Sequence, residues 1–230
     1  MNVLALETAT EACSAAVSRG SHVVLRHEVL ERGHAARILS MVDEVLREAL
    51  LRLSDLDAIA FGRGPGAFTG VRLAASVCQG LAYGAHKPIV AVSTLQAMAQ
   101  DALDRHPQAT HVQVCNDARM KEVYFGMFTR GADGLVVPAG PERVGPPHSA
   151  APEQGAVLTG RWVAVGRGLA AYPALADSWT AAGAFLEPER LPSALAVLRL
   201  AWPCVARGEV LPPTAAVPVY VRDNVARPKS

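Results

Sequence analysis

The chain has 230 residues, of which half are apolar and 19% are charged; this composition is typical of a folded globular protein and excludes a disordered one. The formal net charge is only +1 at pH 7, without a run of Lys or Arg, which disfavours strong binding of nucleic acid by this chain alone. Four widely spaced cysteines, none in a C-x-x-C pair, argue against a disulfide framework or a zinc site.

The N-terminus, MNVLALETAT, has no basic region and carries Glu7 where a secretory signal would be apolar. No stretch has enough consecutive apolar residues for a membrane span. We therefore expect a cytoplasmic protein that has no membrane partner.

The first hundred residues predict the element order βββαβαβα. Apolar runs and helical spacing predict strands over 2–8, 12–20 and 22–30, a helix over 34–53, a strand over 56–62, a helix over 70–85, a strand over 89–93 and a further helix capped by Ser93, with Gln96 completing a capping box. Three consecutive strands followed by alternating helices and strands favour an α/β fold with a mixed sheet, which is the order of ribonuclease-H-like and actin-like domains.

The second half is richer in proline, with 14 of the 16 prolines beyond residue 106. Residues 111–131 predict two strands joined by a turn around Asp117, residues 138–155 a loop, and residues 193–208 a helix that Pro203 kinks or ends. We divide the chain into an N-terminal domain, residues 1–104, and a smaller, degenerate second domain, residues 105–230. The last segment is expected to dock back on the first domain.

Residues 61–74, FGRGPGAFTGVRLA, place a glycine-rich loop between a predicted strand and a predicted helix. Such a loop turns sharply and directs backbone N–H groups at a helix N-terminus outward, which suits an anion. The loop is not a P-loop, because no lysine is near it, and it is not a dinucleotide fingerprint, because Thr69 stands where the last glycine is needed. Candidate residues for a phosphate site are Gly64, Gly66, Thr69 and, at the end of the first strand, Glu7. The alternative, a purely structural turn, is favoured by the residues alone.

Five segments resemble one family, TsaB (also called YeaZ). They are VLALETATEACSAAV, RGHAARILSMVDEVL, GRGPGAFTGVRLAASVCQGLAYG, NDARMKEVYFGMF and PVYVRDNVARP, in that order along nearly the whole chain. The resemblance implies two actin-like (ribonuclease-H-like) domains and a role in forming N6-threonylcarbamoyladenosine (t6A) at the tRNA adenosine 3′ of the anticodon. It also implies two partners: TsaD, which shares the fold and performs the transfer, in a heterodimer, and TsaE through the TsaB–TsaD complex.

The family's TsaD partner carries a metal-binding H-x-x-x-H motif on the helix that follows the fifth strand. The matching positions here are Thr94 and Met98, neither of which suits a hard catalytic metal, and no histidine lies between His86 and His106. We therefore expect a non-catalytic subunit, an inactive paralogue without metal, catalytic residues or a required cofactor, with ATP at most at the level of the complex and tRNA contacted only indirectly. A metallopeptidase is disfavoured by the same missing ligands. The alternative function is an actin-like ATPase or kinase that acts alone through the Gly62–Gly70 loop.

The first two predicted helices are the candidate partner surface. The apolar set of the first is wider than one core-facing stripe, and the second is rich in small residues, which let another helix approach closely. The expected contact residues are His34, Ile38, Met41, Val42, Val45, Leu46, Arg72, Ala75 and Gln79. The alternative is that both helices only cover their own sheet. Exposed apolar helix faces also favour a homodimer when the partner is absent.

Overall fold

The structure, a computed structural model, describes residues 1–153 and 158–221. In the first half of the chain, five strands form a sheet in the order β3-β2-β1-β4-β5. Their bounds are β1 Val3–Glu7, β2 Ala12–Arg19, β3 His22–Val29, β4 Ala58–Gly62 and β5 Ile89–Val92. Strand β1 pairs antiparallel with β2 and parallel with β4, and all of its residues are buried. It is therefore the centre of a mixed sheet.

Three helices follow the strands in the predicted places, so the order βββαβαβα is confirmed. They are α1 His34–Glu48, α2 Phe68–Ala85 and α3 Thr94–Arg105, and Ser93 caps α3 by accepting the Gln96 N–H. Helix α1 ends five residues before its predicted end, because Leu50 takes a left-handed conformation and a short 3-10 helix, Leu53–Asp55, follows. Helix α2 begins two residues before its predicted start.

The second sheet has six strands among the described residues, in the order β11-β10-β6-β7-β8, with β9 also paired to β7. Their bounds are β6 His111–Arg119, β7 Glu122–Arg130, β8 Val136–Pro138, β9 Arg143–Gly145, β10 Trp162–Val165 and β11 Phe185–Glu187. Two helices, α4 Arg167–Ala171 and α5 Pro173–Ala181, connect β10 to β11 along the chain. The β6–β7 turn was predicted around Asp117, but it lies at Met120 and Lys121. The predicted loop over residues 138–155 contains β9 and a 3-10 helix, Pro147–Ala150, elements too short to give a periodic pattern.

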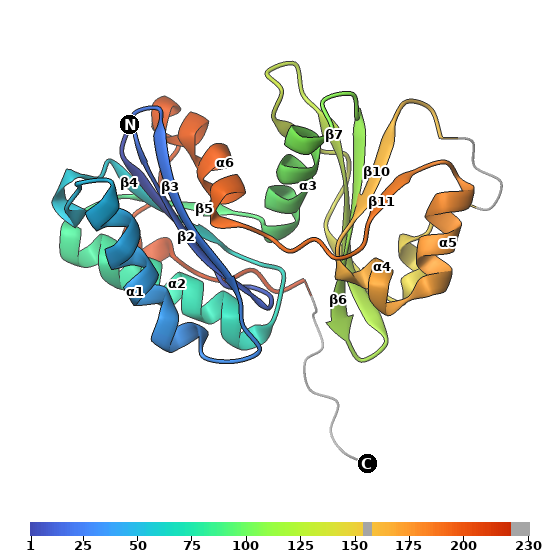
Figure 1. Ribbon diagram of the computed structural model, residues 1–230, viewed down its shortest axis with the longest axis horizontal. Coiled ribbons are helices and arrows are strands. Elements are labelled where there is room, and N and C mark those ends of the chain that lie inside the picture. The colour runs from blue at the N-terminus through green and yellow to red at the C-terminus, as the bar shows by residue number, and fades with distance from the viewer. Residues whose placement is uncertain (154–157, 222–230) are drawn as a thin grey trace, which may run out of the picture.

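Helices α3 and α6 (Ala194–Arg207) lie between the two sheets, as Figure 1 shows. Helix α6 contacts β1, β2, β4 and β5, and it also packs against α3. One apolar cluster contains Ala5 of β1, Leu95 of α3, Val197 of α6 and Val112 of β6, so a continuous core joins the two halves. Pro203 lies inside α6 and does not end it.

The outer layers cover the other face of each sheet. Helices α1 and α2 pack against the first sheet over their own apolar cluster, and α4 and α5 lie beside the second sheet (Figure 1). No helix in the described ranges is both long and apolar enough to cross a membrane.

The segment that follows α6 runs back along the first sheet. The backbone of Leu211 pairs with Ile89 of β5, and the Val219 N–H donates to the Arg63 carbonyl oxygen at 2.8 Å. The end of the last resembling segment, from residue 222, lies outside the described residues, as do residues 154–157. The domain boundary between residues 104 and 105 stays a prediction.

Loss of one buried hydrogen bond between α6 and the first sheet should lower the stability of the protein. The Ser14 hydroxyl of β2 accepts the Ala194 N–H at 2.9 Å, and both residues are fully buried. We expect Ser14→Ala to lower the free energy of unfolding by about 1–3 kcal/mol, because the Ala194 N–H then lacks a partner. Urea denaturation measures this, and the exposed Ser40→Ala is the control; an equal effect of both variants would contradict the prediction.

Candidate functional site

Glu7 is the last residue of β1, and its carboxyl group lies inside the protein. Its Oε1 accepts the Ala9 N–H at 2.7 Å, its Oε2 accepts the Thr94 hydroxyl of α3 at 3.0 Å, and the residue is fully buried. A Cβ at Gly62 of β4 would lie 2.0 Å from Oε2, so glycine is needed there. Burial raises the pKa of Glu7 to about 7, although the hydrogen bonds act in the opposite direction.

The glycine loop between β4 and α2 packs directly on the loop that follows β1. A Cβ at Gly66 would lie 2.4 Å from the Ala9 carbonyl oxygen, and one at Gly70 would lie 2.1 Å from the Thr8 carbonyl oxygen. The Thr8 hydroxyl donates to the Gly70 carbonyl oxygen at 2.7 Å, and the Ala67 N–H donates to the Ala9 carbonyl oxygen at 2.7 Å. These glycines therefore let two backbones meet, which supports the structural-turn interpretation.

The four predicted phosphate-site residues do not converge on one anion-binding cradle. Gly64 is buried with φ +95°, and its carbonyl oxygen accepts the Thr94 N–H at 2.9 Å. Thr69 is exposed on the first turn of α2, whereas the Glu7 carboxyl lies beneath the surface with both oxygens hydrogen-bonded. This carboxyl is not placed to hold a metal ion or a phosphate. Binding of phosphate by the loop stays a prediction.

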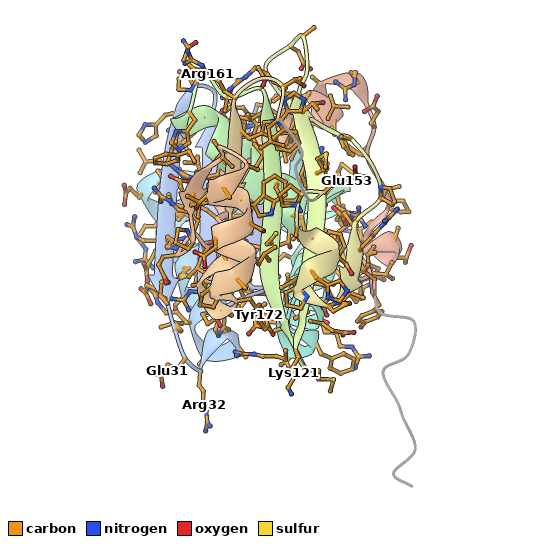
Figure 2. All side chains as sticks on the ribbon, turned by 90° about the vertical axis from the view of Figure 1, so that its right-hand side faces the viewer. Glu31, Arg32, Lys121, Glu153, Arg161 and Tyr172 are labelled. Atoms are coloured by element: carbon orange, nitrogen blue, oxygen red, sulfur yellow. The ribbon has the colours of Figure 1, made fainter. Side chains whose placement is uncertain are left out.

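A cleft of about 860 Å³ lies above this packed floor. Its walls come from the loop after β1, the N-terminal ends of α1 and α2, the β6–β7 turn and the chain near residue 220. Gly66 and Thr69 line it, but Gly64 and Glu7 do not. Figure 2 shows Glu31 and Arg32, which line the cleft, at the same end of the molecule as Lys121 of the turn, and Arg161 at the opposite end.

The β6–β7 turn adds features that the sequence did not reveal. Arg119, Met120 and Lys121 all have positive φ angles, which is uncommon for residues other than glycine. Arg119 pairs with Asp117 and, across the cleft, with Glu11 at 3.5 Å. The run DARMKE signals a charged turn, but it contains no glycine or asparagine to indicate the left-handed conformation.

At the two positions that the family resemblance matches to metal ligands, the side chains form hydrogen bonds within the chain instead. Thr94 donates to Glu7, and the Met98 sulfur accepts the Asn116 Nδ2 at 2.9 Å. Over residues 1–153 and 158–221, no group of three or more His, Cys, Asp or Glu side chains could hold a metal ion.

Most of the predicted partner-contact residues point into the protein. The six apolar ones, all buried beneath α1 and α2, are Ile38, Met41, Val42, Val45, Leu46 and Ala75. Their helical spacing places these residues on the side of each helix that covers the sheet. They therefore cannot themselves form the predicted partner-contact surface. His34 is half-buried, with its Nε2 3.0 Å from the Thr10 carbonyl oxygen, while Arg72 and Gln79 are exposed. A partner surface on these helices stays a prediction, and it would use their outer side.

Comparison with known proteins gives one consistent result. Residues 26–146 match the family model described as TsaD: tRNA N6-adenosine threonylcarbamoyltransferase. The tRNA threonylcarbamoyladenosine biosynthesis protein TsaB of Escherichia coli is 41% identical over 228 residues, which cover 98% of this chain and 96% of that protein.

Two solved structures show the same architecture. YeaZ from Pseudomonas aeruginosa, at 41% identity, aligns with a TM-score of 0.83 over 95% of this chain and 99% of that one. The activator of 2-hydroxyisocaproyl-CoA dehydratase from Clostridium difficile, solved with bound ADPNP, aligns with a TM-score of 0.50 at 8% identity, over 91% of this chain and 97% of that one. Because its identity is so low, the Clostridium difficile activator shows a similar fold and nothing about function. The predicted α/β, actin-like fold class is confirmed.

Neutralising Glu7 should change how stability depends on pH. Its pKa in the folded protein, about 7, lies above the ordinary value of 4.5, so the folded state binds the proton more tightly than the unfolded state. The contribution of this tighter proton binding to the free energy of unfolding is complete below about pH 4.5 and is lost as the pH rises through about 7. We expect Glu7→Gln to remove most of this fall in the free energy of unfolding, measured by urea denaturation from about pH 5 to about pH 8.

The exposed Glu31→Gln serves as the matched control and is expected to keep the wild-type pH profile. A Glu7→Gln protein whose stability falls with pH as steeply as the wild type would show that another group is responsible.

Proposed function

Because this chain belongs to the TsaB (YeaZ) family of tRNA threonylcarbamoyladenosine biosynthesis proteins, as its sequence predicted, we propose that it is a non-catalytic subunit required for t6A formation. In this proposal TsaD performs the transfer and binds this chain as a heterodimer, and TsaE joins through that complex. This chain contacts tRNA only indirectly and needs no cofactor of its own. It also forms a homodimer when TsaD is absent.

One observation carries the non-catalytic part of the proposal. Thr94 and Met98, on one side of α3, are engaged with Glu7 and Asn116 in the interior. Neither side chain suits a hard metal ion, and the nearby Glu7 carboxyl is fully buried with a hydrogen bond to each oxygen. The same closed floor disfavours the alternative of an ATPase or kinase that acts alone, because Glu7 is turned away from the cleft.

The outer side of α1 and α2 supports a role in binding a protein partner. Leu39 and Tyr83 are exposed large apolar residues on this side. Gly80 lies in the interior of α2 and Gly84 lies in its last turn; both are exposed, and a Cβ at either would meet no atom of the described chain within 4 Å, the adjacent helix backbone aside. A glycine inside a helix costs about 0.5–1 kcal/mol relative to alanine. Packing within the described chain does not explain these glycines, whereas close approach of a partner helix would.

Reconstitution tests the function directly. Purified TsaD and TsaE, ATP, a threonylcarbamoyl donor and unmodified tRNA should form t6A only when this chain is added, and this chain without TsaD should form none. Mass spectrometry of digested tRNA measures the product. Product from this chain alone, or ATP hydrolysis by it at ordinary enzyme rates, would instead favour the independent-enzyme alternative.

Alanine at Gly80 or Gly84 should have opposite effects on the chain and on the complex. We expect Gly80→Ala to raise the free energy of unfolding by about 0.5–1 kcal/mol, because it favours the helix, and Gly84→Ala, in the last turn, to raise it by less. Both variants should weaken binding to TsaD, because the added methyl group occupies the approach surface. Urea denaturation and isothermal titration calorimetry measure the two effects.

Gly70→Ala on the same helix is the matched control for stability, and it should destabilise the chain because its Cβ would meet the Thr8 carbonyl oxygen. If the Gly80 and Gly84 variants are stabilised yet bind TsaD with unchanged affinity, the interface lies elsewhere.

A further inference from the structure

Arg72 lies over the Phe68 ring at the N-terminal end of α2, and the Tyr220 ring lies beside both of these side chains. Its guanidinium carbon lies 3.6 Å from the centroid of the Phe68 ring and 5.7 Å from that of the Tyr220 ring. Its Nε donates to the Tyr220 hydroxyl at 2.7 Å. Phe68 and Arg72 are one helical turn apart, whereas Tyr220 belongs to the segment that follows α6. The contacts fix both the orientation of the guanidinium and the course of that segment.

This stack, composed of Phe68, Arg72 and Tyr220, faces solvent. Phe68 is 51% exposed and Tyr220 is 44% exposed, and Arg72 is also exposed. Within the described part of the chain, no carboxylate forms an ion pair with Arg72, and neither of its Nη atoms has a hydrogen-bond acceptor. Arg119, in contrast, pairs with two carboxylates. Among the described residues, Arg72 is therefore an oriented cation whose two Nη groups have no acceptor, next to two exposed rings.

Such a group has the chemistry of a binding anchor. Aromatic residues and arginine are enriched among the residues that dominate the energy of protein interfaces. A planar guanidinium binds a carboxylate through two parallel hydrogen bonds, and less conformational freedom is lost on binding when the side chain is already fixed.

The stack is continuous with the outer side of α2. Gln79, two turns further along the helix, donates through Nε2 to the Pro213 carbonyl oxygen at 3.2 Å. A short 3-10 helix, Pro213–Ala215, contacts α2 in the same region. The segment that follows α6 thus lies along α2 from Pro213 to Tyr220 and adds its exposed side chains to those of the helix.

We infer that the Phe68–Arg72–Tyr220 stack binds a carboxylate side chain set among apolar groups on the surface of TsaD, so that the segment after α6 forms part of that interface. This inference rests on the proposed function and identifies one chemical contact within it. The guanidinium, which has no carboxylate partner among residues 1–153 and 158–221, is complementary to a negative charge, and the two rings are complementary to an apolar surround.

The experiment measures the affinity of the full chain for TsaD by isothermal titration calorimetry at low and at high salt. Arg72→Met keeps much of the side-chain volume but removes the charge, and Phe68→Ala removes one ring. We expect each variant to raise the Kd about tenfold or more, and Arg72→Met to lose most of the salt dependence seen in the wild type. Phe185→Ala, which removes an aromatic ring of similar exposure (58%) on β11, is the matched control and should bind as the wild type does.

Melting temperatures of all variants show whether the fold is retained, and Phe68→Ala keeps the test valid if Arg72→Met is poorly folded. If both folded variants bind TsaD with the wild-type Kd, the stack only holds the segment after α6 and the inference is wrong. If the wild-type chain itself does not bind TsaD, the proposed function fails, which is a different result.

Discussion

The buried carboxyl of Glu7 is the constraint on which the centre of the molecule depends. A carboxyl taken out of water requires hydrogen-bond partners, and here the Ala9 N–H and the Thr94 hydroxyl supply them. It also requires space, which Gly62 provides because no Cβ fits beside it. One side chain thereby determines the conformation of the loop after β1, the residue at the end of β4 and the position at which α3 begins. An open site would need a carboxylate within reach of solvent, whereas Glu7 is fully buried and bonded within the chain.

Helix α3 extends this constraint to the second sheet. Its capping residue, Ser93, donates to Glu142, a residue of the second half, whose other oxygen lies 4.0 Å from Arg63. The positive end of the helix dipole thus faces carboxyl groups from both halves, an arrangement that stabilises the helix. With α3 and α6 sharing one apolar core between the sheets, the two halves are held together by packing as well as by hydrogen bonds. A protein built in this way is suited to present a fixed surface.

The sequence predicted what depends on local periodicity and missed what depends on distant neighbours. Alternation and helical spacing gave the order βββαβαβα, but they could not show that Met41 and Val45 belong to the chain's own core, because a wide apolar set does not reveal where the sheet lies. The short strands β9 and β11 carry too few residues for a pattern. The contact between Tyr220 and Arg72 joins residues 148 positions apart, so no local signal exists for it.

The glycines of α2 and of the loop before it look alike in the sequence, but the structure gives different reasons for them. Gly66 and Gly70 look like an anion-binding loop, yet each is required because a backbone carbonyl lies where its Cβ would be. Gly80 and Gly84 look alike in sequence, but no atom of the described chain requires them. Alanine would stabilise α2 more than glycine does, most of all at Gly80 in the helix interior. The proposed partner against the outer side of α2, the side that Phe68 and Arg72 continue toward the cleft, gives these two glycines a reason that the described chain does not.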